Sequence, residues 1–314
     1  MEEALYSQFG FFNTDLVRSA KKGDFLTSPE VSIYFGKILR NWINNSCNLN
    51  KIVEIGSGTG SLIEQIGIKE ITAIELSSTA REELINKGIM THTNVNELTL
   101  EKSELVFGNE ILDNVPCSIG IYRDKVWYEK VVAIQENSFS YDIKPIRNEE
   151  LDWINKNNIV PNEDHELEIQ VNIDKFLNTV IKKISPKNIL LFDYGYEQVN
   201  REKRKYNSLL RTYKNHHLSV DPIEDPGNID ITYDVNFSSL SRELKTLGYD
   251  VTLKLQRNFL LENGFDIIFD ELQEKYLVAE GMEKLKINSE LNGLKAIVDS
   301  NGLGGFYCLN AQKL

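Results

Sequence analysis

The chain has 314 residues and a formal net charge of −12. An acidic surface repels phosphate backbones, so this charge argues against a nucleic-acid-binding protein. The three cysteines are widely spaced and form neither a disulfide framework nor a Cys/His metal pattern. We therefore expect no metal site and a reducing compartment.

The first residues, Met1–Tyr6, lack the basic start and apolar run of a signal peptide and the Arg-rich character of a transit peptide. No apolar stretch approaches the ~18 residues that a membrane-spanning helix needs. These features predict a cytoplasmic protein that has no membrane partner.

Residues 1–46 are expected to form a helical and loop cap. Apolar residues recur at helical spacing from Val31 to Trp42, which predicts one amphipathic helix. Ser28 is its expected N-cap, and Pro29 is its expected first helical residue.

A parallel sheet is predicted to begin in residues 47–117, the expected cofactor-binding core. Apolar runs predict strands at Lys51–Ile55, Ile71–Glu75 and Leu105–Gly108, with a weaker one near Met90–Thr93. Residues 118–187 form an insertion, in which period-two alternation over 118–147 predicts antiparallel hairpins set into the sheet. Helices are expected to follow at Glu149–Asn158 and Ile173–Ile184.

Residues 188–314 are expected to complete the sheet, starting with the apolar strand Asn188–Phe192. Segment 196–236 is polar and is predicted to be a loop-rich insertion on the substrate side. The later elements are expected at Phe237–Leu247 (helix), Val251–Leu255 (strand), Glu271–Lys286 (one helix) and Phe306–Leu309 (strand). This order predicts a single α/β domain, residues 1–314, with a mostly parallel, doubly wound, Rossmann-like sheet.

The most informative segment runs from Ile52 to Gly60, Ile-Val-Glu-Ile-Gly-Ser-Gly-Thr-Gly, with Glu75 at the end of the next strand. Glycines let a backbone turn sharply and approach a ligand, and an acid at the second strand end can bind the hydroxyls of a ribose. Glu54 precedes the first glycine, where a carboxylate tolerates a cationic cofactor but not a pyrophosphate. The pattern therefore favours S-adenosylmethionine (SAM) over a dinucleotide.

Acidic residues follow three of the predicted strands at the same edge of the sheet. Because ligands bind outside the carboxyl ends of parallel strands, this edge should hold Asn109, Glu110, Asp113 and Asp193 around one crevice. Crowded acids are stable when they face cations, such as a sulfonium cofactor and a guanidinium or ammonium substrate. The alternative is that Asp113 and Asp193 cap helices.

The polar stretch from Asp225 to Phe237 allows two interpretations. It is either a turn, an edge strand and a helix cap, or a lid that contributes hydrogen-bond acceptors over the crevice. His216 lies just before it, and no acid and nucleophile accompany it as a hydrolase triad would require.

Several motifs in order along the chain resemble the MidA-type class I SAM-dependent methyltransferases. This family includes the mitochondrial arginine methyltransferase that assists assembly of respiratory complex I. The resemblance rests on Gly23–Gly36, Val53–Leu62, Gly108–Pro116, Phe192–Tyr196, Arg211–His216, Pro226–Phe237, Gln256–Gly264 and Gly304–Phe306. It covers nearly the whole chain.

The resemblance implies a SAM-dependent methyltransferase with a protein arginine as the acceptor. The cofactor residues that it and the glycine loop imply are Thr27, Pro29, Glu30, Glu54, Gly56, Ser57, Gly58, Thr59, Gly60, Glu75, Leu76, Asn109 and Glu110. Glu110 is the first candidate to orient the guanidinium, Asp193 the second and Asp113 a third. The implied substrate-binding residues are Tyr194, His216, Asp230 and Thr232.

Two departures from the family pattern keep other functions open. Asn114 replaces a usual alanine, and no glycine opens the insertion motif before Leu209-Leu210-Arg211. A small-molecule N- or O-methyltransferase and a SAM-binding assembly factor with little catalysis are the alternatives. The aromatic residues Trp127 and Tyr128 permit a partner surface, for which a homodimer is one option.

Overall fold

Seven strands form the central sheet in a computed structural model, which describes residues 1–314 apart from 14–25, 100, 137, 204–208, 215–216 and 219–220. Their order across the sheet is β15-β16-β9-β4-β1-β2-β3. In chain order the strands are β1 (Ile52–Ile55), β2 (Ile71–Ile74), β3 (Met90–His92), β4 (Leu105–Asn109), β9 (Asn188–Asp193), β15 (Tyr249–Leu255) and β16 (Tyr307–Lys313).

The pairing of these strands gives a mostly parallel sheet. β1 pairs in parallel with β2 and β4, β2 with β3, and β4 with β9. β16 runs antiparallel to both of its neighbours, β9 and β15. The predicted α/β, Rossmann-like fold class is confirmed, and each predicted strand of this sheet is present.

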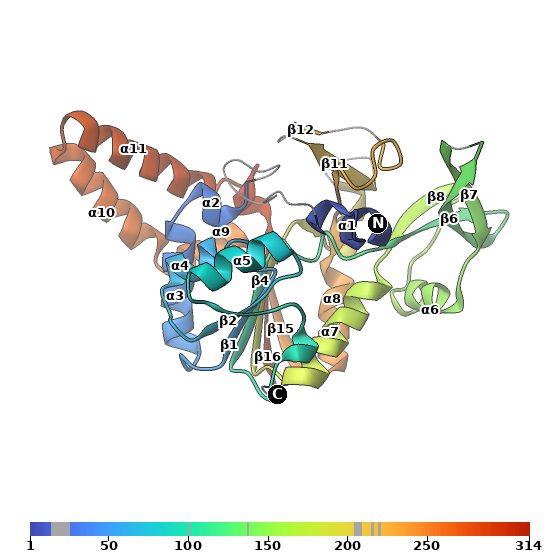
Figure 1. The fold of residues 1–314 in the computed structure, drawn as a ribbon, viewed down its shortest axis with the longest axis horizontal. Coiled ribbons are helices and arrows are strands. Elements are labelled where there is room, and N and C mark those ends of the chain that lie inside the picture. The colour runs from blue at the N-terminus through green and yellow to red at the C-terminus, as the bar shows by residue number, and fades with distance from the viewer. Residues whose placement is uncertain (14–25, 100, 137, 204–208, 215–216, 219–220) are drawn as a thin grey trace.

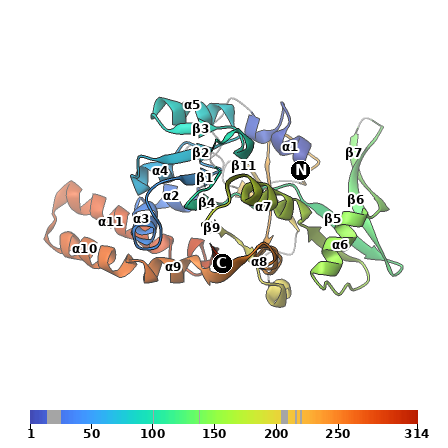
Figure 2. The same cartoon turned by 90° about the horizontal axis from the view of Figure 1, so that it is seen from below.

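Helices cover both faces of the sheet, because alternate side chains of the buried strands point to opposite sides. On one face, Phe107 and Phe192 pack with residues of α3 (Tyr34–Ser46), α4 (Ser61–Ile66) and α9 (Gln256–Glu262). On the other, Val106 and Leu191 pack in clusters with α7 (Val171–Ile184) and α8 (Phe237–Thr246). Figure 2 shows α3 and α4 on one side of the strands and α7 and α8 on the other.

The first insertion forms a separate four-stranded sheet of order β7-β6-β5-β8. It consists of β5 (Ser118–Arg123), β6 (Val126–Gln135), β7 (Ser138–Pro145) and β8 (His165–Ile169), with helix α6 (Asn148–Lys156). The predicted hairpins are therefore present, but they project from the body and do not enter the parallel sheet (Figure 1). Trp127, Trp153 and Leu167 give this unit a small core of its own.

The second insertion contains more strand than the sequence predicts. β11 (Leu210–Lys214) pairs antiparallel with β12 (His217–Leu218) and β13 (Asp230–Tyr233), and β10 (Gly195–Tyr196) pairs in parallel with β14 (Val235–Asn236). The expectation of a loop over 196–236 is wrong for these strands. Ile229 and Ile231 explain why, since they pack on Leu5 and Phe11 of the N-terminal cap and so give the segment a buried face.

Two predicted helices are each divided in the structure. The helix expected over Val31–Trp42 is split into α2 (Ser28–Val31) and α3, because Ser32 adopts an extended conformation. Thr27, not Ser28, is the N-cap of α2, and Pro29 is its second residue. The helix expected over Glu271–Lys286 is a hairpin of α10 (Phe265–Val278) and α11 (Gly281–Ala296), which Ala279 interrupts in an extended conformation.

The remaining elements are short. They are α1 (Glu2–Tyr6), α5 (Ser78–Asn86) and the 3-10 turns Phe11–Asn13, Val95–Glu97, Gln198–Lys203 and Leu303–Gly305. Within the described part of the chain, none of the helices has the length and apolar character that crossing a membrane requires.

Candidate functional site

A pocket of about 590 Å³ lies at the carboxyl ends of β1, β2 and β4. Helices α1 and α2 lie over this edge of the sheet (Figure 1). The pocket brings together most of the residues that the sequence predicted as cofactor-binding, namely Thr27, Pro29, Glu30, Glu54, Gly56, Ser57, Gly58, Thr59, Glu75, Leu76, Asn109 and Glu110.

The glycine-rich loop takes a shape that other residues would strain. Gly56 and Gly58 have φ values of 69° and 51°, in the left-handed region that favours glycine. A Cβ at Gly56 would lie 2.4 Å from Cγ2 of Ile111, so the loop packs directly against the segment after β4. Gly60, with φ of 85°, caps α4 and is not among the residues that line the pocket.

Glu75 connects the end of β2 to the glycine loop. One carboxylate oxygen accepts a hydrogen bond from the Gly58 N–H at 2.8 Å, and the other accepts one from the Ser77 N–H at 2.8 Å. Burial raises the pKa of Glu75, while these two hydrogen bonds oppose the rise. The carboxylate is thus fixed in orientation at the pocket wall.

Glu54 is a buried carboxyl, and one of its two oxygens lacks a hydrogen-bond donor among the described residues. Its side chain is 2% exposed, and its Oε2 has no hydrogen-bond partner among the described residues. Burial raises the pKa of Glu54 well above its usual range, and the nearby Glu75 adds to the rise. A buried acceptor of this kind is stabilised by a cationic ligand. SAM carries a sulfonium and an ammonium group, so these residues fit that cofactor.

The N-terminal cap closes the pocket through a capping box. A carboxylate oxygen of Glu30 accepts a hydrogen bond from the Thr27 N–H at 3.1 Å and one from the Thr27 hydroxyl at 3.3 Å. The Pro29 carbonyl accepts a hydrogen bond from Gln65 Nε2 at 2.6 Å. The cap is therefore fastened to α4 of the core by a side chain that follows the glycine loop.

Glu110 lies on this pocket in a strained conformation. Its φ of 53° is in the left-handed region, which non-glycine residues rarely adopt. Its Oε1 accepts hydrogen bonds from Asn109 Nδ2 at 2.9 Å and from the Ser28 N–H at 3.3 Å, so the acid also contacts the cap. Burial, reinforced by Asp113, raises the pKa of Glu110 to about 8.

Asp193, the second candidate to orient the acceptor, is not among the residues that line the pocket. It is fully buried at the end of β9. Its Oδ2 accepts hydrogen bonds from the N–H groups of Ile111 at 3.1 Å and Leu112 at 2.8 Å, and its Oδ1 accepts one from Tyr194 at 2.9 Å. Asp193 thus holds the backbone that follows Glu110.

Asp113 is buried and Tyr194 half-buried, and neither lines the pocket. The Tyr194 hydroxyl donates a hydrogen bond to Asp113, and the Arg211 guanidinium lies 4.8 Å from the centre of the Tyr194 ring. Arg211 also pairs with Asp234 at 2.9 Å. Burial raises the pKa of Asp113, and Tyr194 and Arg211 oppose the rise.

The other predicted substrate residues are likewise enclosed. Asp230 and Thr232 are 3% and 2% exposed, and Asp230 accepts a hydrogen bond from Asn114 Nδ2 at 2.9 Å. Neither lines the pocket, and Asp230 bonds to Asn114 of the loop after β4. His216 lies outside the described residues, as do Gly23–Phe25 of the N-terminal motif.

Sequence reasoning missed the part of the pocket that comes from distant segments. Tyr6 and Phe12 belong to the aromatic N-terminal cap, and Phe176 and Thr179 belong to α7. The turn after β3 contributes Asn94–Asn96. The aromatic residues near the start of the chain were a usable signal for the cap, whereas no local pattern marks α7 as a pocket wall.

Residues 36–253 match the model of a family described as S-adenosyl-L-methionine-dependent methyltransferases. The match covers more than half of the chain, and the chain therefore belongs to this family. Membership confirms the predicted family resemblance, the methyltransferase class of enzyme and SAM as the cofactor.

Two curated relatives are similar over most of the chain. A Caenorhabditis elegans relative, the NDUFAF7 homolog, is 25% identical over 309 residues, which span 83% of this chain and 70% of the relative. Rattus norvegicus NDUFAF7 is 25% identical over 300 residues, 81% of this chain and 67% of the relative. Both are named mitochondrial protein arginine methyltransferases. These names contradict the cytoplasmic location expected from the sequence.

Solved structures share the fold. A Burkholderia thailandensis protein bound to S-adenosyl-homocysteine has a TM-score of 0.86 and 21% identity, with 99% of this chain and 86% of that chain covered. A second structure from the same organism has a TM-score of 0.82 at 22% identity, with 99% and 85% covered. The whole described architecture, insertions included, is therefore that of a known fold.

Proposed function

We propose that this methyltransferase transfers the methyl group of SAM to an arginine side chain of a protein. The names of the curated relatives support an arginine acceptor. The observation that carries the proposal is the carboxyl of Glu110, which is half-buried on the cofactor pocket. A carboxylate in such a place can bind a guanidinium by paired hydrogen bonds.

The cofactor contacts follow from the wall of the pocket. Glu75 binds the ribose hydroxyls, and Gly56–Gly60 pass beneath the amino-acid part of SAM, with Glu54 nearby as a carboxyl acceptor. Thr27, Pro29 and Glu30 close over the cofactor, and Leu76 and Asn109 complete the wall. When bound, SAM supplies an electrophilic methyl group on a sulfonium sulfur.

Glu110 is the group that orients the acceptor. Guanidinium has a pKa above ~12 and arrives protonated. With a pKa of about 8, the Glu110 carboxyl is mostly protonated near neutral pH, and an arriving cation lowers that pKa and favours the carboxylate. Both hydrogen bonds of this carboxyl within the described chain use Oε1, which leaves Oε2 to accept from the guanidinium.

Asp193 and Asp113 act through Glu110 and its loop. Asp193 fixes the two N–H groups after Glu110, and Asp113 adds negative charge that raises the Glu110 pKa. We assign both as positioning residues. Tyr194, Asp230 and Thr232 are assigned to the support of the loop after β4.

Other features of the proposal rest on the sequence. We treat residues 1–314 as one methyltransferase domain with two insertions. A protein is the partner, with neither nucleic acid nor membrane as a ligand, and a homodimer is an arrangement to test. The small-molecule methyltransferase and the SAM-binding assembly factor are alternative outcomes of the experiment below.

The test incubates the protein with radiolabelled SAM and arginine-containing basic peptides, and follows methylarginine by mass spectrometry. Glu110→Gln should lower turnover by roughly 10²–10³, because charge stabilisation in the transition state is lost. Its affinity for S-adenosyl-homocysteine should stay within about threefold of wild type. Glu283→Gln, on the exposed face of α11, is the matched control.

Equal losses of turnover and cofactor affinity would show that Glu110 is a cofactor residue. Cofactor binding without transfer to any arginine would overturn the arginine proposal. Transfer to free amines would then favour the small-molecule alternative, and no transfer at all would favour the assembly factor.

A further inference from the structure

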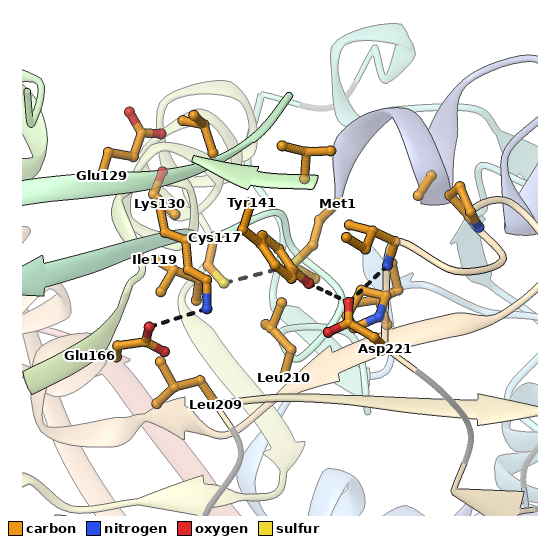
Figure 3. A pocket seen from close by; sticks show the side chains of 18 of the residues that line it. Met1, Cys117, Ile119, Glu129, Lys130, Tyr141, Glu166, Leu209, Leu210 and Asp221 are labelled. Atoms are coloured by element: carbon orange, nitrogen blue, oxygen red, sulfur yellow. Dashed lines mark hydrogen bonds and ion pairs between the residues drawn. The ribbon is translucent and has the colours of Figure 1, made fainter. Parts of the chain in front are cut away.

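A second and larger pocket, of about 1090 Å³, lies between α1, the β6–β7 hairpin and strands β11 and β13. Figure 3 shows Tyr141 and Lys130 of the hairpin facing Leu209 and Leu210 across it. Its volume exceeds the roughly 300–1,000 Å³ that small-molecule sites occupy, so a polypeptide segment suits it better. We call this pocket the docking cleft.

The docking cleft and the cofactor pocket lie on the two sides of α1. Glu2 of α1 lines both of them. The segment after β4 also joins them, since Pro116 lines the cofactor pocket and the next residue, Cys117, lines the cleft. A chain that crosses α1 can therefore occupy the cleft and present one side chain to the cofactor pocket.

Contacts between α1 and its surroundings fix this arrangement. The Tyr6 hydroxyl donates a hydrogen bond to the Asn114 carbonyl at 3.0 Å, and Asn114 Nδ2 donates to the Ile231 carbonyl at 3.2 Å. Ile231 also lines the cleft. The wall between the two pockets is thus tied to the backbone that carries Glu110.

One wall of the docking cleft is an exposed apolar sheet face. The register Val132↔Tyr141 and Ile134↔Phe139 places these four side chains on the same side of the β6–β7 hairpin, and all of them except Ile134 line the cleft. Val132 is 53% exposed, Ile134 75% and Phe139 48%. Exposed apolar side chains gathered on one face mark an interaction surface.

The charge of the docking cleft favours a basic ligand. Its described lining has six carboxylates, Glu2, Glu3, Glu129, Asp164, Glu166 and Asp221, against three cationic groups, which are the side chains of Lys130 and Arg201 and the amino group of Met1. Three of the carboxylates have cationic partners, because Glu129 pairs with Lys144, Glu166 with Lys130 and Asp164 with Arg123. Among the described residues, the lining has three more carboxylates than cationic groups, so the cleft is negative. A second copy of this chain, at −12, is repelled from such a surface, whereas a basic segment is attracted.

We infer that the docking cleft binds the acceptor protein through an extended segment that carries basic and apolar side chains. The apolar side chains lie on the β6–β7 face, the basic ones face Glu2, Glu3 and Asp221, and the acceptor arginine passes α1 into the cofactor pocket. This inference rests on the proposed function, because it names how the same site takes its substrate.

The test uses a short fluorescein-labelled peptide of Arg, Lys, Leu and Phe as the probe, with fluorescence anisotropy at low and high salt. The double substitution Val132→Ser, Phe139→Ser should weaken binding about tenfold through lost apolar contact. Glu3→Lys should weaken it about threefold and reduce its dependence on salt. Cofactor affinity, measured with S-adenosyl-homocysteine, should not change in either variant, which also verifies that they fold.

Matched controls lie on the helical hairpin far along the chain. Leu277→Ser on α10 and Glu283→Lys on α11 change residues of the same kinds at exposed positions, and should leave peptide affinity unaltered. Equal affinities in the cleft variants and these controls would overturn the inference. It would also be overturned if the cleft variants abolished self-association of the protein, since a second copy would then be the occupant.

Methylation of the same peptide separates this inference from the proposed function. The cleft variants should raise KM for the peptide about tenfold and leave kcat unchanged, because they remove binding and not chemistry. Methyl transfer with an unchanged KM in the cleft variants would overturn the inferred docking role of the cleft and would leave the proposed arginine methyltransferase function intact. Peptide binding that depends on the cleft, with no methyl transfer, would uphold the cleft and overturn the proposed function.

Discussion

The seven-stranded sheet and the four-stranded insertion sheet differ in what their strands bury. Every residue of β1, β2 and β9 is buried, whereas nearly all of β7 is exposed. Buried parallel strands fix the position of their carboxyl ends, and those ends carry the cofactor pocket. The insertion sheet instead leaves apolar side chains exposed on one face, where we propose that the acceptor protein binds.

The largest expected effect comes from truncating the buried sheet. Leu190→Ala in β9 should lower the free energy of unfolding by about 2–5 kcal/mol, because Leu190 is fully buried among aromatic side chains. Ile134→Ala in β6, 75% exposed, should change it by less than about 0.5 kcal/mol. Urea unfolding of both variants measures the difference, and similar losses would contradict the contrast between the two sheets.

Removal of Glu75 should damage the cofactor pocket most among single acids. Glu75→Ala deletes one hydrogen bond from the Gly58 N–H of the glycine loop and one from the Ser77 N–H, as well as the proposed ribose contact. We expect S-adenosyl-homocysteine affinity to fall about 10²-fold, as measured by calorimetry. Glu70→Ala, at an exposed position before β2, serves as the control. Retained affinity in Glu75→Ala would remove this residue from the cofactor site.

Loss of the carboxylate behind Glu110 should have a smaller effect on catalysis. Asp193→Asn cannot keep all of its hydrogen bonds to backbone N–H groups, and we expect stability to fall by about 1–3 kcal/mol. A positioning role also predicts that kcat falls about tenfold while the peptide KM stays within about twofold. A merely structural role would reduce the amount of folded protein and leave the kcat of that fraction unaltered.

The smallest predicted effect is a dependence of stability on pH. The pKa of Glu110 in the folded protein, about 8, is above its usual value of 4.5, so the native state holds a proton that the unfolded state has lost. Stability from this group is present in full below pH 4.5 and is lost as pH rises through 8. Without ligand, wild type should therefore lose more stability than Glu110→Gln over this range. Parallel profiles in chemical denaturation would contradict a raised Glu110 pKa.

The sequence predicted the strands of the central sheet because each is a short apolar run that both helical layers cover. The prediction from sequence was wrong where contacts between distant segments determine the secondary structure. Ser32 and Ala279 divide helices whose apolar pattern continues past them, and the strands in 196–236 depend on burial against the N-terminal cap. The local spacing of apolar residues gives no information about these features.

For the candidate site, too, the sequence predicted the local features but not those that depend on the folded structure. The glycine loop and Glu75 lie where the motif implies, since both are set by local turns at strand ends. The motif could not separate Glu110 from Asp193, because Glu110 directly follows β4 and Asp193 is the last residue of the neighbouring strand β9. The left-handed backbone at Glu110 leads its side chain to the pocket, while Asp193 bonds to backbone behind it. The different orientations of Glu110 and Asp193 depend on how the loop after β4 folds.

The central position of β16 has a consequence for synthesis. This strand comes after β15 in the chain, yet it lies between β15 and β9 and bonds to both. While a ribosome is still adding these residues, β9 and β15 each present an unpaired edge, the kind of surface on which nascent chains associate wrongly. The sheet that supports Asp193 is therefore complete only after residues 307–313 have emerged and paired with β9.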